Sequence, residues 1–305
     1  FTVPGTSGTS PPRVRQRVLP AGDVPPGARH LRVLRSDDLR ILRHSAGERY
    51  RILSEGAVLS PGGKSLALVV RGADAPEVLL LDLSGPSPEA VGVAMPGSPK
   101  DVEPRSLTVT DDGLFFSIQD MSGSWSVLRA AIAARDAAGL MPAERIAGPF
   151  EALPPYMASS RSAVVFLAGS AMDSLDVFVV QGGDPAANLT QSPGRHLPHS
   201  PALPRLAVSD DGASVAYNRI LGAESETCVQ ALAEPGVGGR RDITTDERFN
   251  PYIIQESLIL YTVSGRLIFA GGHDPVSTDL FSVDPAPRPG MDVINLTRTG
   301  SGIQP

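Results

Sequence analysis

Residues 206–217 read LAVSDDGASVAY, and residues 107–117 read LTVTDDGLFFS. In both stretches a β-prone run is followed by Ser or Thr, by Asp-Asp-Gly and by a second run rich in apolar residues. Asp-Gly between two such runs is a strong hairpin signal, because the tight turn needs positive φ angles, which glycine adopts without steric cost. Each stretch therefore predicts two antiparallel strands joined by a turn.

Further copies of this turn recur along the chain. Gly63 in LSPGGKSLALVV lies 50 residues before Gly113, and Gly113 lies 99 residues before Gly212, which is close to two periods. The spacing predicts a copy near residue 162, where MASSRSAVVFLAG has an apolar run after a polar turn without glycine. A further step of about 45 residues from Gly212 predicts a copy at Ser257 in YIIQESLILYT, again with a degraded turn.

Two further strand-like runs follow the hairpins. The third strands are EVLLLDLSG (77–85), SLDVFVVQGG (174–183) and TDLFSVDPA (278–286), and the closing strands are AANLT, RDITT and VINLT. Upstream, residues 13–55 offer four more strand candidates in which Arg alternates with Leu, Val and Ile, as in a half-exposed sheet. VLRAAIAARDAAG (127–139) is either a helical turn inserted into a unit or that unit's third strand with an attached loop.

Four-stranded units that repeat at about 40 to 50 residues are typical of a β-propeller. A single small sheet cannot bury both of its apolar faces, and a ring places another sheet on either side. A β-sandwich is the competing all-β fold, but it has no reason to repeat its turn at a fixed interval. We therefore predict an all-β protein with a flexible lead-in at residues 1–12 and a single β-propeller domain at residues 13–305. Its six four-stranded antiparallel blades, with seven as the alternative, span residues 13–56, 57–105, 106–155, 156–205, 206–251 and 252–305.

Composition and charge narrow the classes of partner. Hydrophobic residues make up 41% and charged residues 20% of the 305 residues, which fits a globular protein with its own core. The net charge of −6 gives no general attraction to nucleic acid, and no run of 18 apolar residues could span a membrane. The single cysteine, Cys228, excludes an internal disulfide and a zinc site of several thiolates. Because the chain starts at Phe1 rather than Met, we expect that a leader or another upstream segment has been removed.

The repeats resemble a known family. LSPGGKSLALVV followed by VLLLDLSG, and VSDDGASVAYNR followed by DITT, look like the TolB-type repeat of WD-repeat-like propellers, over most of residues 57–300. The resemblance implies a propeller fold and a periplasmic or secreted protein. The family includes the Tol-Pal translocation propeller, the propeller domains of prolyl-oligopeptidase-like peptidases and some polysaccharide lyases. The copies near residues 162 and 257 depart from the pattern because they lack Asp-Gly.

In a propeller, the segments that join one blade to the next gather at one end of the central channel. Their polar side chains could converge on a ligand there, because a pocket needs a few placed polar groups in a mostly apolar wall; the alternative is that they are solvated loop tips. The candidate ligand-binding residues are Asp101, Glu103, Glu151, Arg195, His196, His199, Arg248 and Asn250.

His196 and His199 raise the question of a divalent cation, which two imidazoles beside carboxylates could bind. Pro198 and Pro201 deny this stretch a helix that would align the two rings, so we predict no resident metal or cofactor and keep a cation in the channel as the alternative. We place His273 in a loop and Cys228 in a strand, where a small apolar side chain is expected.

No sequence motif provides a catalytic constellation. Neither a nucleophile elbow nor a glycine-rich phosphate loop is present in the chain. We interpret the aspartate pairs 111–112 and 210–211 as turn residues, because Asp bonds its own backbone and tolerates left-handed geometry. The sequons at Asn188 and Asn295 coincide with closing strands, so we interpret them as structural.

The sequence thus predicts a monomeric, non-catalytic TolB-like propeller that binds a protein or peptide partner through its loop face or central channel. The alternatives are a metal-assisted lyase or hydrolase that uses the channel-mouth His, Arg and carboxylates, and a propeller domain of a larger enzyme. If His196 and His199 point together toward Glu103 or Glu151, the enzymatic alternative is favoured.

Overall fold

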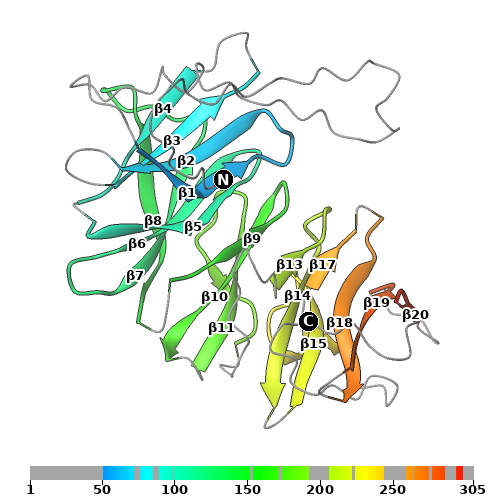
Figure 1. Ribbon diagram of the computed structural model, residues 1–305. Helices are drawn as coiled ribbons and strands as arrows, with labels where there is room; N and C mark the ends of the chain where they lie inside the picture. The colour runs from blue at the N-terminus through cyan, green and yellow to red at the C-terminus, as the bar shows by residue number, and fades with distance from the viewer. Residues whose placement is uncertain are drawn as a thin grey trace, which may run out of the picture.

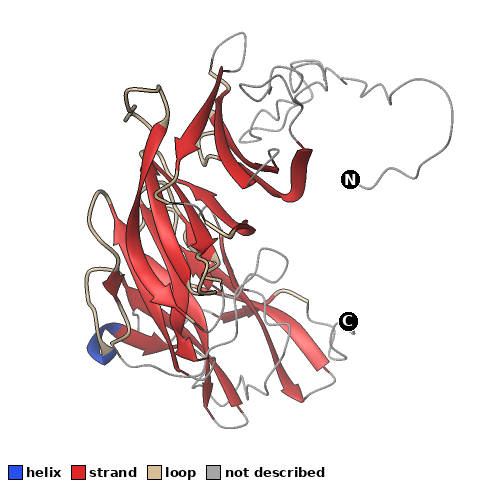
Figure 2. Ribbon diagram, turned by 90° about the vertical axis from the view of Figure 1, so that its left-hand side faces the viewer, coloured by secondary structure: helices blue, strands red, loops and turns tan. Residues whose placement is uncertain are grey.

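The computed structural model describes residues 51–71, 76–84, 89–97, 99–151, 154–171, 174–191, 206–221, 224–243, 259–262, 264–274, 277–285 and 293–297. Their secondary structure consists of β strands and one short 3-10 helix, Val237–Gly239, so the predicted all-β class is confirmed (Figure 2). None of these segments is a long apolar helix of the kind that crosses a bilayer. The predicted lead-in and most of the predicted blade at 13–56 lie outside the described residues.

The described strands, in chain order, are β1 (Arg51–Leu59), β2 (Ser65–Arg71), β3 (Pro76–Asp82), β4 (Glu89–Ala94), β5 (Asp101–Val109), β6 (Gly113–Gln119), β7 (Trp125–Ala131), β8 (Met141–Phe150), β9 (Met157–Ser159), β10 (Ala163–Ala171), β11 (Ser174–Gln181), β12 (Ala187–Asn188), β13 (Leu206–Val208), β14 (Ser214–Leu221), β15 (Glu224–Ala231), β16 (Arg240–Asp242), β17 (Ile259–Tyr261), β18 (Leu267–Asp274), β19 (Ser277–Val283) and β20 (Val293–Asn295). They fall into five runs of four strands, which we name units 1 to 5 in chain order. Within a unit each strand pairs antiparallel with the next one along the chain.

Units 1 and 2 belong to one eight-stranded sheet, whereas units 3, 4 and 5 are separate four-stranded sheets. The larger sheet exists because β4 and β8, the last strands of units 1 and 2, pair in parallel. This pairing is short and joins Val93 to Met141 and Ala94 to Pro142.

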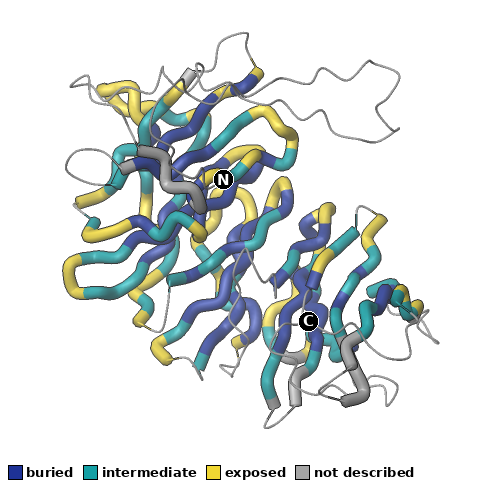
Figure 3. The backbone as a smooth tube through the Cα atoms, viewed as in Figure 1, coloured by how far each residue is buried: buried dark blue, intermediate teal, exposed yellow. Residues whose placement is uncertain are grey.

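The units are stacked along their first strands. β1 contacts β5, β5 contacts β9, β9 contacts β13, and β13 contacts β17. Figure 1 shows the units following one another from blue to orange, and Figure 3 shows that the strands carry most of the buried residues. A buried apolar cluster spans each interface between neighbouring units. The four clusters include Val69 and Phe116, Phe115 and Phe166, Val165 and Tyr217, and Ala216 and Phe269. The stacking therefore removes from water the apolar faces that one small sheet could not bury alone.

A hydroxyl residue begins the first hairpin turn of every described unit. These residues are Ser60, Thr110, Ser160, Ser209 and Thr262, which are 50, 50, 49 and 53 positions apart. Each hydroxyl oxygen accepts a hydrogen bond of 2.9 to 3.2 Å from a backbone N–H on the far side of its turn. The predicted repeat thus has a physical basis, because this bond holds the turn closed.

The two copies without Asp-Gly have different outcomes. The hairpin predicted near residue 162 is confirmed, since β9 and β10 pair across the turn that begins at Ser160. The turn predicted at Ser257 is wrong. Residues 259–261 form the first strand of unit 5, and the turn follows at Thr262 and contains Gly265, whose φ angle is +80°. The step of about 45 residues from Gly212 to Ser257 was too short, because the hydroxyl residues of units 4 and 5 are 53 positions apart.

The predicted glycine geometry holds for part of the repeat. Gly63 and Gly212 both have a φ angle of +69°, as expected for a tight turn. The prediction is wrong for Gly113, which is the first residue of β6 and has no positive φ angle. A Cβ at Gly113 would lie 2.8 Å from Cε2 of Phe115, so this glycine provides space for a ring rather than an unusual backbone.

Two local expectations can be compared directly with the strands. Residues 127–139 follow the strand interpretation: β7 ends at Ala131, and Asp136 Oδ1 then accepts the N–H groups of Ala138 and Leu140, both at 2.9 Å, in the turn before β8. The helix alternative is therefore wrong.

His273 lies within β18 rather than in a loop, because the β18–β19 pairing continues through a register shift as far as Asp274.

The Asn-Leu-Thr runs hold closing strands in place. Asp176 is buried, and its two oxygens accept hydrogen bonds from Asn188 Nδ2 at 2.9 Å and Thr190 Oγ1 at 2.6 Å. In unit 5 the corresponding carboxylate, Asp279, accepts bonds from Asn295 at 2.8 Å and Thr297 at 2.5 Å. Both sequons thus have the structural role that we inferred.

Candidate functional site

The predicted site residues are only partly described. Arg195, His196, His199, Arg248 and Asn250 lie outside the described residues. We expected Asp101 and Glu103 in a segment that joins two blades. This expectation is wrong, because β5 begins at Asp101 and pairs with β6 through Asp101 and Glu103. The carboxylate of Glu103 accepts the nearby N–H of Arg105 at 3.1 Å, and Glu151 follows the end of β8. None of these three carboxylates lines either of the pockets described below.

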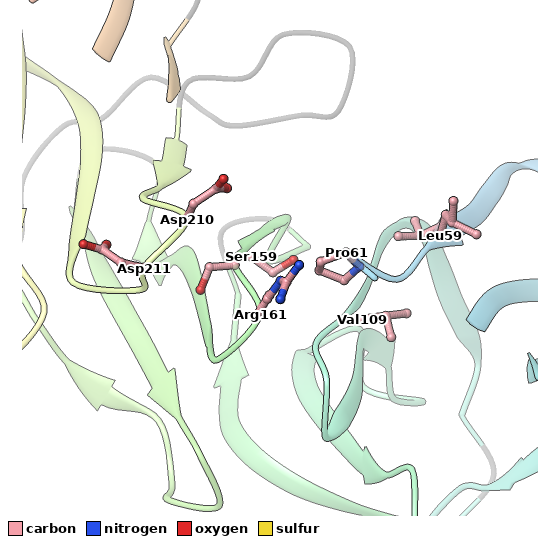
Figure 4. A pocket seen from close by; sticks show the side chains of 9 residues that line it. Leu59, Pro61, Val109, Ser159, Arg161, Asp210 and Asp211 are labelled. Carbon is pink, nitrogen blue, oxygen red and sulfur yellow. The ribbon is translucent and has the colours of Figure 1, made fainter. Parts of the chain in front are cut away.

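A pocket of about 610 Å³ lies at the hairpin-turn end of the first strands (Figure 4). We name it the turn pocket; its lining residues are Val58, Leu59, Pro61, Val109, Ser159, Ser160, Arg161, Asp210 and Asp211. They come from units 1, 2, 3 and 4. Val109 is the last residue of β5 and Asp101 is the first, so the pocket and the predicted residue Asp101 lie at opposite ends of this strand.

Contacts between neighbouring units fix the walls of the turn pocket. The backbone N–H of Asp111 in unit 2 donates to the carbonyl oxygen of Arg161 in unit 3 at 3.0 Å. The hydroxyls of Thr108 and Ser159 are 2.6 Å apart. On the other side of unit 3, Gly212 packs so closely that a Cβ there would lie 2.7 Å from Ser162 Oγ. The turns are therefore held by one another and not only by their own strands.

The two sides of the turn pocket differ in chemistry. Figure 4 shows Asp210 and Asp211 on one side, Leu59, Pro61 and Val109 on the other, and Ser159 and Arg161 between them. The apolar side is accessible, since Leu59 is 47% exposed. Sequence reasoning missed this pocket because it assigned the aspartate pair to turn chemistry alone.

Asp211 accepts hydrogen bonds within its turn and also lines the turn pocket. Its Oδ1 accepts hydrogen bonds from Ser209 Oγ at 2.6 Å and from the N–H of Ala213 at 2.9 Å. These bonds, the one from Ser209 first, hold the pKa of this carboxyl below its ordinary value. Asp211 is therefore ionised at neutral pH and contributes a negative charge to the pocket wall.

Asp210 and Arg161 are exposed and carry opposite charges. Among the described residues neither side chain has a hydrogen bond or an ion pair, although both line the same pocket. Their charges are consequently available to a bound molecule.

A second pocket, of about 860 Å³, lies between units 4 and 5 and shares Asp210 and Asp211 with the turn pocket. Its two arginines are engaged within the fold. Arg240 Nε lies 3.2 Å from Asp242 Oδ1, and Arg241 Nη1 donates to the Pro285 carbonyl at 2.9 Å. Burial raises the pKa of Tyr261 to about 12, so its hydroxyl, 3.1 Å from Ser214 Oγ, stays protonated. Both arginines of this pocket thus have partners within the fold, whereas the Arg161 side chain of the turn pocket has none among the described residues.

Glu226, Cys228 and Asp242 form a third cluster, whose potential ligand atoms lie within 4.8 Å of one another. Cys228 is buried, as predicted, and its thiol donates to Asp242 Oδ1 at 3.0 Å. Burial, with the bond to Asp242, raises the pKa of the thiol, which therefore stays protonated, whereas a metal ligand must be a thiolate. In unit 4, Cys228 of the third strand pairs with Asp242 of the closing strand. In unit 3 the corresponding pair is Phe178 and Asn188, so the cluster lies where the Asn-Leu-Thr contacts lie in unit 3.

Solved structures with a similar fold include TolB from Acinetobacter baumannii, with 16% identity, a TM-score of 0.46, and coverage of 78% of this chain and 53% of that chain. A prolyl endopeptidase structure matches with 11% identity and a TM-score of 0.52 over 81% of this chain and 36% of that chain. The β-propeller domain of the trilobed protease from Pyrococcus furiosus matches with 11% identity and a TM-score of 0.46 over 79% of this chain and 71% of that domain's chain. The stacked four-stranded units are typical of a β-propeller, and TolB and a β-propeller domain are among the solved structures that the chain resembles.

The similarity is one of fold. The chain spans about half of the Acinetobacter TolB chain and about a third of the prolyl endopeptidase chain. No protein-family model matches the sequence, and no curated protein is similar to it in sequence.

Proposed function

We propose that this protein is a monomeric, TolB-like propeller of six blades that binds a protein or peptide partner through one end of its central channel. The five described units are the proposal's candidates for five of these blades. The observation that carries the proposal is the turn pocket, where residues from four consecutive units meet. A ligand there would contact several blades at once, which suits recognition of a chain segment.

The chemistry of the turn pocket supports binding. Its hydroxyls take part in the fold: Ser159 is bonded to Thr108, and Ser160 Oγ accepts the N–H groups of Ser162 and Ala163 at 3.3 and 3.2 Å. The remaining polar groups are two carboxylates and one guanidinium beside an apolar wall. A few placed polar groups next to apolar surface are typical of pockets that hold a ligand in one orientation.

The location that we propose is the periplasm or the outside of the cell. It rests on the resemblance to TolB-type repeats together with the fold shared with TolB. Fractionation of the native protein tests it, and recovery in the cytoplasmic fraction would contradict it.

A propeller domain within a larger enzyme is the second candidate function. It is favoured by the match to prolyl endopeptidase, of which the chain spans 36% at a TM-score of 0.52. The gene sequence upstream of Phe1 and downstream of Pro305 tests this candidate. A hydrolase domain encoded in the same frame would favour it over a free-standing binding protein.

The test of the proposed function is selection of peptides from a random library displayed on phage, with the whole 305-residue chain as the target. Leu59→Arg places a bulky charge on the apolar side of the turn pocket, and we expect it to weaken binding of the selected peptides about tenfold. Met121→Arg is the matched control, because Met121 is 80% exposed in the turn between β6 and β7 and lines neither pocket. The proposal fails if no peptide is enriched, or if enriched peptides bind the Leu59→Arg protein as well as the wild type.

A further inference from the structure

We infer that the turn pocket recognises a basic peptide segment, in which an aliphatic side chain packs against Leu59 and a neighbouring Lys or Arg pairs with Asp210. The inference rests on the proposed function and adds to it the face of the propeller and the class of ligand. Three observations support it. Arg161 and Asp210 have no ion pair among the described residues, the carboxylates of the turn pocket outnumber its guanidinium, and the pocket has an accessible apolar side beside these charges.

Within the part of the chain that the structure describes, Arg161 and Asp210 differ from the paired arginines in having no ion pair. Arg129 lies 3.8 Å from Asp112 and 3.7 Å from Glu144, and Arg240 is paired with Asp242. Arg161 and Asp210 line a common pocket without such a partner. A ligand that pairs with them therefore breaks no existing ion pair, and the gain from each new contact is not offset by a lost one.

The balance of charge favours a cation. Asp210 and Asp211 face one guanidinium in the turn pocket, and both aspartates also border the pocket between units 4 and 5, whose arginines already have partners. The potential along the shared edge is therefore negative, and it attracts a positively charged segment. Arg161, on the far side of Ser159, would donate to a main-chain carbonyl oxygen of the same segment.

The apolar wall explains why the ligand is a peptide and not a simple cation. Leu59 is 47% exposed beside Val58, Pro61 and Val109, and covering such a wall is favourable by roughly 25 cal/mol for each Å² of apolar surface removed from water. A volume of about 610 Å³ exceeds that of a single side chain and lies in the range of ligand pockets, about 300 to 1,000 Å³. A short chain segment with one aliphatic and one basic side chain fits both the wall and the carboxylate.

The experiment uses a positional-scanning library of end-blocked hexapeptides, measured by fluorescence polarisation against the whole chain. We expect pools with Lys or Arg next to Leu or Ile to bind about three- to tenfold more tightly than the matching Gln pools, as for an accessible charge pair, and Glu pools to bind least. Asp210→Lys should invert this order in favour of Glu, and Asp210→Asn should abolish the preference without inverting it.

Asp184→Lys is the matched control. Asp184 is exposed in the turn between β11 and β12 and lines neither pocket, so the preference for basic pools should be unchanged. Urea unfolding of each variant checks that it is folded. A lack of charge preference in the wild type, or a preference that survives Asp210→Lys, would overturn the inference. If Leu59→Arg weakens peptide binding but charge has no effect, the proposed function stands and only the basic-peptide inference fails. If Leu59→Arg weakens the binding of no peptide, the proposed function and the inference both fail.

Discussion

Units 2 and 4 contain the same Asp-Asp-Gly sequence in their first hairpins, yet the two turns differ in length and in surroundings. In unit 2 the turn spans residues 110–113, with Val109 paired to Leu114. In unit 4 it spans residues 209–214, with Val208 paired to Val215. Both turns keep the bond from the hydroxyl to the second aspartate, at 2.8 Å in unit 2 and 2.6 Å in unit 4.

The residues after the glycine account for the difference in length. In unit 2 the apolar run LFF follows Gly113 at once, and its burial draws Gly113 into the strand. In unit 4 Ala213 and Ser214 separate Gly212 from Val215, and in unit 1 Lys64 and Ser65 separate Gly63 from Leu66, so both turns are longer. The position at which the buried apolar run begins, rather than the sequence of the turn itself, therefore sets the register of each hairpin.

The surroundings account for the difference in chemistry. The second aspartate of unit 2, Asp112, faces Arg129 at 3.8 Å, whereas both aspartates of unit 4 line pockets. The repeated sequence therefore determines the hydrogen bonds within the turn, whereas the residues of the neighbouring units determine whether its aspartates are paired or line a pocket.

The largest effect is expected for Gly212→Ala. An alanine at a φ angle of +69° is strained, and its Cβ would lie 2.7 Å from Ser162 Oγ and 3.2 Å from Ser160 Oγ, so we expect a loss of about 2 to 3 kcal/mol in the free energy of unfolding. Gly63→Ala has the same φ angle but no atom within 4 Å of the new Cβ, and it should cost only about 1 kcal/mol. Urea denaturation measures both. Equal losses would contradict the close packing of the unit 4 turn against unit 3.

The next effect is expected for Ser209→Ala. The hydroxyl of Ser209 accepts the N–H of Ser214 at 2.9 Å and donates to Asp211, so its removal should cost about 1 to 2 kcal/mol of unfolding free energy. Ser209→Thr keeps both bonds and should be nearly neutral, because Thr110 and Thr262 hold the equivalent position in units 2 and 5. A loss of the same size for Ser209→Thr would mean that the site responds to shape and not to the hydroxyl.

Much of the fold could be predicted from the sequence because each unit repeats short motifs that indicate its strands and its first turn. The third strand SLDVFVVQGG and the closing strand AANLT are β11 and β12, and the degenerate turn near residue 162 was found from spacing alone. The turn in unit 5 was misplaced, since Ser257 is about 45 residues from Gly212, whereas Gly265 of the observed turn is 53 residues from it.

The turn pocket could not be predicted in the same way. It brings together Leu59, Val109, Arg161 and Asp210, which are separated by about 50 residues each along the chain. Each of them has a sufficient local explanation as a strand end or turn residue. Only the stacking of four units shows that they share one cavity, whereas the predicted channel-mouth residues lie mostly outside the described residues.

A smaller effect is expected for Asp211→Asn, and it should depend on pH. The pKa of Asp211 is lowered in the folded protein by its hydrogen bonds, mainly that from Ser209, so the ionised carboxylate stabilises the fold above the ordinary aspartate pKa of about 3.9. This contribution is lost as the pH falls through the folded-state pKa. The difference in unfolding free energy between wild type and Asp211→Asn should therefore be full near about pH 6 and shrink below about pH 4. A difference that stays constant down to about pH 2.5 would assign the effect to shape instead of charge.

The smallest effect is expected for Asp112→Asn, the matched change in unit 2. The asparagine keeps an oxygen that can accept the hydroxyl of Thr110, so the variant loses only the attraction to Arg129. The side chain of Asp112 is 53% exposed and its partner atom is 3.8 Å away, so solvent screens the pair, and we expect a loss of at most about 0.5 kcal/mol. Added salt should reduce this loss further, because the pair is accessible to counterions. A large, salt-independent loss would show that Asp112 is bound to its neighbour as tightly as Asp211 is to its own turn, and the contrast between a paired and an available aspartate would then disappear.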